Sequence, residues 1–189
     1  MACPSRVGFL RGRFTDPAEE FLMRAVLNLT AFATDLAGRG VPIRLAMGLA
    51  AQAERWRPLV DYRTDTRWYR VVERTEQYEV WLLSWLPGQG TDLHDHGPAS
   101  GAFTIAAGTL TERVVAIKPD QPPVEVTHTL AAGGCRAFGP HYVHQVTNTA
   151  TVAAVSVHVY TPALTVMNRY RLEPAGLRHL SVEQAGVNW

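Results

Sequence analysis

Residues 88–96 read GQGTDLHDH, and this stretch decides how the rest of the sequence is interpreted. His94 and His96 are separated by one residue, so on a β-strand both side chains point to the same face of the sheet. His144, later in the chain, could join them from a neighbouring strand. Three neutral imidazoles on one side of a metal ion leave its other side open, which is the arrangement of a catalytic metal rather than a structural one.

Composition places the chain among ordinary globular proteins. Its 189 residues suffice for one domain with a real core, and a formal net charge of +1 gives no reason to expect nucleic acid or a membrane as partner. Cys3 and Cys135 are too few for a disulfide framework. The N-terminus lacks a secretion signal and no apolar run reaches the roughly 18 to 20 residues of a membrane span. We therefore expect a cytoplasmic protein, and the sequence leaves its oligomeric state open.

The first part of the chain is predicted to be helical, over about residues 16–57. Asp16 and Pro17 are typical of a helix N-terminus, and residues 38–40, read GRG, are typical of its end. A second helix is predicted from near Pro42 to about Pro58.

From about residue 68 the sequence pattern changes from that of helices to that of β-strands. Short runs rich in β-branched and aromatic residues alternate with glycine and proline turns. The predicted strands are 69–74, 78–86, 93–96, 101–106, 110–117, 124–130, 134–138, 144–148 and 152–160. No element is assigned after Pro162. Many short strands indicate a sandwich or barrel, so we predict a mainly β single domain, residues 1–189, with a barrel over about 68–165 and the helical part packed on it.

The spacing of the histidines resembles the two sequence motifs of the cupin superfamily. The first is Gly88, five residues, His94-x-His96 and then Gly108, and the second runs from Gly134 through Pro140 to His144 and Asn148. The resemblance implies a double-stranded β-helix, or jelly roll, with the three histidines inside its mouth. Gly101 stands where the first motif normally has a glutamate. Without that carboxylate the metal keeps its full charge, which favours an anionic ligand such as a thiolate.

Further residues add the features of a substrate pocket. Ser156, His158 and Tyr160 alternate along one predicted strand and so share one face. Arg70 is the candidate clamp for a substrate carboxylate, because a planar guanidinium binds both oxygens, and Arg67 and Arg74 are the alternatives. His141 competes with His144 as third ligand, but its odd offset from His144 directs it away. Asp95, between the two ligands, is expected to face the other way.

These residues occur together in an order that resembles the cysteine dioxygenases, most closely their bacterial members. The similarity covers roughly residues 65–165 and includes Tyr69-Arg70, the run WLLSWLPGQGT at 81–91, HDHG at 94–97, Gly101-Ala102-Phe103, Gly108-x-Leu-x-Glu112, Pro140-x3-His144 and Ser156-x-His158-x-Tyr160. It implies that His94, His96 and His144 bind Fe(II). It also implies that Arg70 pairs with the substrate carboxylate and that Tyr160, oriented by His158 and Ser156, contacts the substrate. The implied reaction is oxidation of L-cysteine by O2 to cysteine sulfinic acid.

Departures from the family pattern shape the choice of substrate. Animal members have a cysteine at the position of Gly101, crosslinked to the active-site tyrosine, so Tyr160 is expected to be unmodified. Relatives that act on 3-mercaptopropionate carry glutamine where this chain has Arg70, which favours cysteine as the substrate. The alternatives are a dioxygenase of another small thiol, 3-mercaptopropionate or mercaptosuccinate, and a non-catalytic cupin that binds a small ligand or a metal such as zinc or nickel.

Overall fold

The computed structural model describes residues 41–117 and 121–184. The chain divides into two units, residues 1–35 and 36–189, and the described residues all belong to the second. The first predicted helix, over about residues 16–38, lies outside the described residues.

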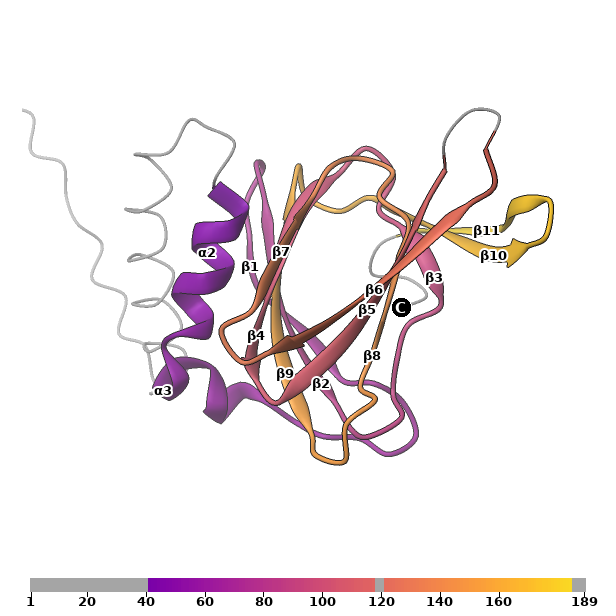
Figure 1. Cartoon of the computed structure of the whole chain (residues 1–189). Helices are drawn as coiled ribbons and strands as arrows, with labels where there is room; N and C mark the ends of the chain where they lie inside the picture. The colour runs from indigo at the N-terminus through magenta and orange to yellow at the C-terminus, as the bar shows by residue number, and fades with distance from the viewer. Residues whose placement is uncertain (1–40, 118–120, 185–189) are drawn as a thin grey trace, which may run out of the picture. The chain divides into compact units, whose positions relative to one another are not determined.

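The second predicted helix is confirmed, but it is interrupted. It consists of α2 (Val41–Ala50), the short α3 (Ala53–Trp56) and a 3-10 turn, η1 (Arg57–Leu59). Gln52 leaves the helical conformation, with φ −102° and ψ 71°, and its side-chain amide donates instead to the carbonyl of Gly48 (2.8 Å). α2 buries Leu45 and Leu49 and packs on strands β4 and β9, so the helix covers one sheet, as Figure 1 shows.

The strands follow in chain order, and the nine predicted ones are confirmed to within a few residues. Their bounds are β1 (Tyr69–Arg74), β2 (Glu79–Trp85), β3 (Leu93–Asp95), β4 (Ser100–Ala107), β5 (Thr109–Ala116), β6 (Val124–Ala131), β7 (Cys135–Phe138), β8 (His144–Thr147), β9 (Ala154–Thr161), β10 (Val166–Glu173) and β11 (Gly176–Gln184).

These strands form two antiparallel sheets. One has five strands in the order β1-β2-β9-β4-β7, and the other has six in the order β11-β10-β3-β8-β5-β6. Chain neighbours such as β4 and β5 belong to different sheets, so the chain winds between the two layers as a jelly roll, the double-stranded β-helix that was predicted. Large buried side chains from both layers, among them Trp85, Phe103 and Leu110, fill the space between them.

The barrel continues beyond residue 165, where no element was predicted. β10 and β11 form an antiparallel hairpin, and β10 also pairs with β3, placing Arg169 opposite His94. The turn signal of this hairpin was present in the sequence as Pro174-Ala175-Gly176. The predicted end of the barrel is therefore corrected to Gln184, and β10 becomes the strand that flanks the histidines.

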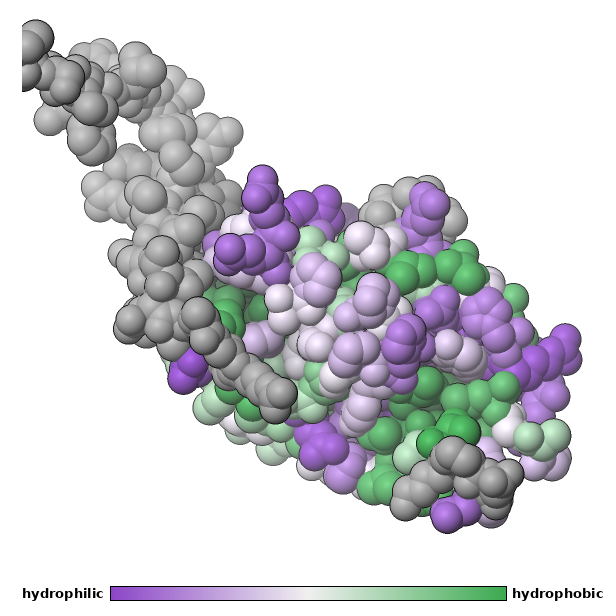
Figure 2. Space-filling view, turned by 90° about the horizontal axis from the view of Figure 1, so that it is seen from above, coloured by the Kyte–Doolittle hydropathy of each residue, from purple (hydrophilic) through white to green (hydrophobic). Residues whose placement is uncertain are grey.

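The surface mixes hydrophobic and polar residues. Figure 2 shows hydrophobic residues gathered in places among polar ones on the face seen from above. Exposed large apolar side chains include Val124 and Val126 on β6 and Leu180 and Val182 on β11. Among the described residues, no helix has the length and apolar character needed to cross a bilayer.

Candidate metal centre

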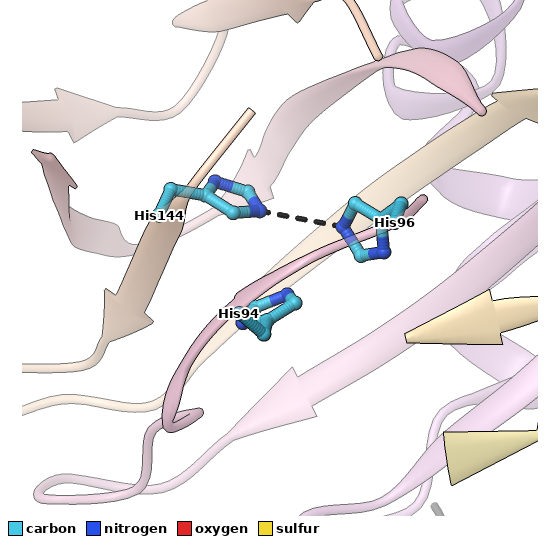
Figure 3. A group of neighbouring side chains, drawn as sticks. All are labelled: His94, His96 and His144. Carbon is cyan, nitrogen blue, oxygen red and sulfur yellow. Dashed lines mark hydrogen bonds between the residues drawn. The ribbon is translucent and has the colours of Figure 1, made fainter. Parts of the chain in front are cut away.

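The three predicted ligands come together on two neighbouring strands of the six-stranded sheet, β3 and β8, and just after the end of β3. His94 on β3 lies directly opposite His144 on β8, and His96 follows the end of β3 by one residue. All three side chains are buried, and one ring nitrogen of each lies within 4.8 Å of the others. In Figure 3 the rings converge on a common point, as the alternation along β3 predicts.

Hydrogen bonds behind the rings decide which nitrogens face that point. The Nδ1 atom of His94 lies 2.8 Å from the backbone carbonyl of Asp92, and Nδ1 of His144 lies 2.9 Å from Oε1 of Glu112. Both acceptors fix the proton on Nδ1, which leaves Nε2 with a free lone pair. Nε2 of His144 lies 3.3 Å from Nε2 of His96. Bonds of about 2.1 Å to one ion separate neighbouring ligand atoms by about 3.0–3.4 Å, so the spacing suits a metal.

The site favours neutral imidazoles. Burial lowers the pKa of His94 and His96 well below the ordinary value of 6.5, and the neighbouring histidines lower each further. A neutral ring offers its lone pair without first losing a proton, so the cluster is ready to bind a divalent cation at neutral pH.

The predicted row on β9 is a chain of hydrogen bonds. The indole Nε1 of Trp85 donates to Oγ of Ser156 (2.9 Å), which lies 2.8 Å from Nε2 of His158. Nδ1 of His158 lies 3.3 Å from the hydroxyl of Tyr160. Because an indole can only donate, the serine proton is left for His158, whose Nδ1–H then points at the tyrosine oxygen. This direction leaves the Tyr160 O–H free to donate into the pocket.

A pocket of about 240 Å³ opens in front of the histidines. Aromatic, polar and charged side chains share its wall. Those that matter for its chemistry are Arg67, Tyr69, Trp81, Trp85, Asp92, His94, His96, His144, His158, Tyr160, Met167 and Arg169.

The structure does not bring the predicted clamp, Arg70, to this pocket. Arg70 is exposed, and it lies outside the pocket lining that contains both Arg67 and Tyr69. Side chains alternate along extended backbone, so residues 67 and 69 share the inward side and residue 70 points outward. Arg74, the other alternative, pairs with the buried Glu79. The arginine of this segment that faces the histidines is therefore Arg67.

Arg67 has unused capacity to bind an anion. Its guanidinium carbon lies 4.7 Å from the ring centre of Trp85, and its Nη1 makes one long contact of 3.4 Å with the carbonyl of Gly90. Its Nε is buried and has no hydrogen-bond partner. A buried donor without a partner is costly, and a bound carboxylate would satisfy it.

The second arginine of the pocket is already neutralised. Arg169 on β10 binds both carboxylate oxygens of Glu183 and places Nη1 2.9 Å from Oδ2 of Asp92. Two acidic partners surround one guanidinium, so Arg169 shapes the wall and is not available to a substrate anion. Arg169 was not among the predicted site residues, because no strand was predicted after Pro162.

Other singled-out residues have structural partners. Asp95 is buried and faces away from the ligands, accepting bonds from the backbone N–H of Gly97 (2.8 Å), the amide of Asn168 (2.7 Å) and the hydroxyl of Tyr170 (2.9 Å). His141 has a side chain that is 70% exposed, and it lies outside the three-histidine cluster.

The residue behind His144 was also missed. The side-chain amide of Asn148, the last residue of the second motif, donates to the carbonyls of Trp85 and Val152. The partner of His144 is Glu112 on β5, which also accepts from Nε of Arg136 (3.0 Å). Burial would raise the pKa of the Glu112 carboxyl, but His144 and Arg136 together outweigh it and lower that pKa. The chain motif that contains Glu112 was visible in the sequence, whereas its contact across the sheet was not.

Comparison with known proteins gives one family match. A family model described as cysteine dioxygenase type I matches residues 24–173. Among solved structures, the protein TT1209 from Thermus thermophilus is 21% identical, with 57% of this chain and 93% of that chain covered and a TM-score of 0.49. A conserved protein with a double-stranded β-helix domain from Klebsiella pneumoniae is also 21% identical, covering 56% and 80%, with a TM-score of 0.48. A cupin superfamily protein from Desulfitobacterium hafniense is 12% identical, covering 55% and 84%, with a TM-score of 0.43.

Proposed function

The chain belongs to the cysteine dioxygenase type I family, and on that premise we propose that it is an iron(II)-dependent thiol dioxygenase that oxidises L-cysteine with O2 to cysteine sulfinic acid. The observation that carries the proposal is the convergence of three groups in one pocket: the histidine cluster, the unpartnered Nε of Arg67 and the hydroxyl of Tyr160.

The donor set fits a ferrous ion. Nitrogen ligands on one side suit iron(II) and leave the remaining positions for two substrates. When bound, ferrous iron would hold the thiol and dioxygen within bonding distance and supply the electron-transfer chemistry between them. The balance needs no further reactant, because both oxygen atoms add to the sulfur and the sulfur provides all the electrons.

The residues around the ion would bind and orient the amino acid. Arg67 pairs with the substrate carboxylate, in place of the sequence-based candidate Arg70. Tyr160, held by His158 and Ser156, donates its O–H to the same end of the substrate or to the reacting oxygen. Burial keeps the pKa of Tyr160 above its usual range, so the hydroxyl remains a donor at neutral pH.

The charges of the pocket favour a thiol with a single acid group. Arg67 forms no ion pair with any described residue, whereas Arg169 has two acidic partners. A second carboxylate, as in mercaptosuccinate, would have to displace Asp92 or Glu183 from Arg169. This supports cysteine or 3-mercaptopropionate over mercaptosuccinate, and the amine of cysteine is the remaining difference between the first two.

The test is oxygen uptake by the full chain reconstituted with ferrous iron. L-cysteine, 3-mercaptopropionate and mercaptosuccinate are compared side by side, the products are identified, and zinc-loaded protein is the control. We expect one O2 consumed per cysteine, cysteine sulfinic acid as product, and no uptake with zinc. A clear preference for 3-mercaptopropionate would keep the dioxygenase and reject cysteine as its substrate. No uptake with any thiol would favour a non-catalytic binding protein.

A further inference from the structure

Glu112 stands directly behind one of the three histidines. It lies on β5, which pairs with β8 so that Val114 is opposite His144 and Glu112 is opposite Val146. Its side chain is fully buried, and each carboxylate oxygen has a partner: Oε1 lies 2.9 Å from Nδ1 of His144, and Oε2 lies 3.0 Å from Nε of Arg136. A carboxylate with an arginine and an imidazole N–H as partners is held ionised in place.

The three histidines differ in what lies behind them. Nδ1 of His94 faces a neutral backbone carbonyl, and Nδ1 of His96 is buried without a partner. Only His144, among the three, has an anion there. An anionic acceptor on Nδ1–H draws the proton toward itself and makes the opposite nitrogen a stronger donor to a metal. The three histidines therefore differ in the group behind the ring, and His144 would be the strongest ligand of a bound ion.

The barrel has no room for a carboxylate at the position where the first motif normally carries one. A Cβ atom on Gly101 would lie 2.6 Å from Cζ of Phe138 and would collide with the backbone carbonyl of Val159. Gly101 sits between β7 and β9, directly opposite Phe138 and Tyr160. A carboxylate at position 101 is therefore excluded by packing, whereas a carboxylate behind a ligand histidine can still act on the ion through the imidazole ring.

We propose that Glu112 is a positioning residue for the metal: it fixes the ring of His144 and, through that ring, lends the centre the negative charge that three neutral imidazoles lack. Arg136 holds the carboxylate from the other side and reaches outward to His128, whose Nε2 lies 3.0 Å from Nη2 of Arg136. The inference rests on the proposed function only through its metal centre.

The test measures metal binding without thiol or oxygen. Glu112→Gln keeps the shape of the side chain and removes its charge. Glu73→Gln is the matched control, because Glu73 is also buried but bonds to the hydroxyl of Tyr78 and lies outside the pocket lining. Affinity for Co(II) is measured on the full chain by competition with a chelator, together with the visible absorption of the bound cobalt.

We expect Glu112→Gln to weaken cobalt binding by about 10- to 100-fold and to shift the cobalt absorption, with Glu73→Gln like the wild type in both. A merely structural role would lower the unfolding midpoint without changing the absorption. Wild-type affinity and absorption in Glu112→Gln would overturn the proposal.

If that variant does not fold, Glu112→Asp replaces it, since it keeps the charge but withdraws it by one methylene. Weakening of about 3-fold or more then supports the proposal, and unchanged binding overturns it. If cobalt binding depends on Glu112 as expected but the protein oxidises no thiol, this inference stands and the proposed function is rejected.

Discussion

At the scale of the residue, Arg67 and Arg70 lie three positions apart in the chain but have different surroundings. Arg67 and Tyr69 lie on the pocket side of extended backbone, and Arg70 lies on the exposed side. Both arginines carry the same charge, so their different surroundings allow a direct comparison in one protein.

Arg67→Gln is expected to weaken the use of L-cysteine and to leave the iron content unchanged. Hydrogen bonds to charged groups contribute about 1.5–3 kcal/mol, which corresponds to a loss of roughly 10- to 150-fold in kcat/KM. Arg70→Gln, the matched control, should stay within about twofold of the wild type because its side chain is in solvent. Steady-state oxygen uptake with L-cysteine measures both. A large loss in Arg70→Gln with Arg67→Gln unaffected would return the clamp to the residue chosen from sequence.

The candidate site was predictable where its residues are close in sequence. The His94-x-His96 pair and the row Ser156, His158 and Tyr160 follow from alternation on a strand, and the structure places them as that rule requires. The sequence alone does not say which of Arg67 and Arg70 enters the pocket, because that depends on which side the strand presents at its first residue. His144 was placed with His94 and His96 through its motif, whereas the contact of Glu112 with His144 has no motif of its own and was not predicted.

At the scale of the element, β4 shows why a glycine is required at one position. Gly101 lies where β4 is flanked on both sides, by β7 and by β9. Any side chain there would meet the ring of Phe138 and the backbone of β9. A glutamate or a cysteine at this position would therefore meet the same obstruction.

Gly101→Cys, or the smaller Gly101→Ala, is expected to reduce the free energy of unfolding. Inserting atoms into a packed core costs about 1–3 kcal/mol, because backbone or ring must move. Gly48→Ala on α2 is the control: a Cβ atom there meets nothing within 4 Å. Since alanine is the better helix former, that change should stabilise by about 0.5–1 kcal/mol. Urea unfolding compares the free energy of unfolding of each variant with that of the wild type. A Gly101→Ala protein as stable as the wild type would show that β4 and β9 separate easily.

The strands themselves were largely readable from the sequence, with one exception that follows from composition. Glycine or proline marks most of the turns between β1 and β9, and β-branched or aromatic residues are frequent in the strands. β10 and β11 carry several charged residues, and most of their residues are exposed or only half-buried. Their alternation of apolar and polar residues is therefore weak. β10 pairs with β3 and β11 pairs with β10, and the contact with β3 is not visible in local sequence.

At the scale of the whole molecule, the histidine cluster lies where the six-stranded sheet has its shortest pairing. β3 and β8 are joined in register at a single position, His94 opposite His144. Around them, β3 pairs with β10 and β8 pairs with β5, so two halves of the sheet meet at the ligands. An ion bound by these side chains would tie the two halves together.

Metal binding is therefore expected to raise the unfolding temperature. A ligand at about 100 times its dissociation constant adds about 2.7 kcal/mol to the stability of the folded state. For a chain of this size each kcal/mol corresponds to about 2–4 °C, so saturation with ferrous iron under anaerobic conditions should raise the midpoint by roughly 5–11 °C over chelator-treated protein. Calorimetry at one scan rate measures both samples.

His96→Ala removes one ligand and should abolish this difference while keeping the sheet pairing, since His96 follows the end of β3. His141→Ala is the matched control, because its ring is largely exposed and outside the cluster, and the midpoint difference should persist in it. A His96→Ala protein that still gains the full rise would mean that the ion binds elsewhere. The joining of the two halves of the sheet at His94 and His144 would then depend on backbone pairing alone.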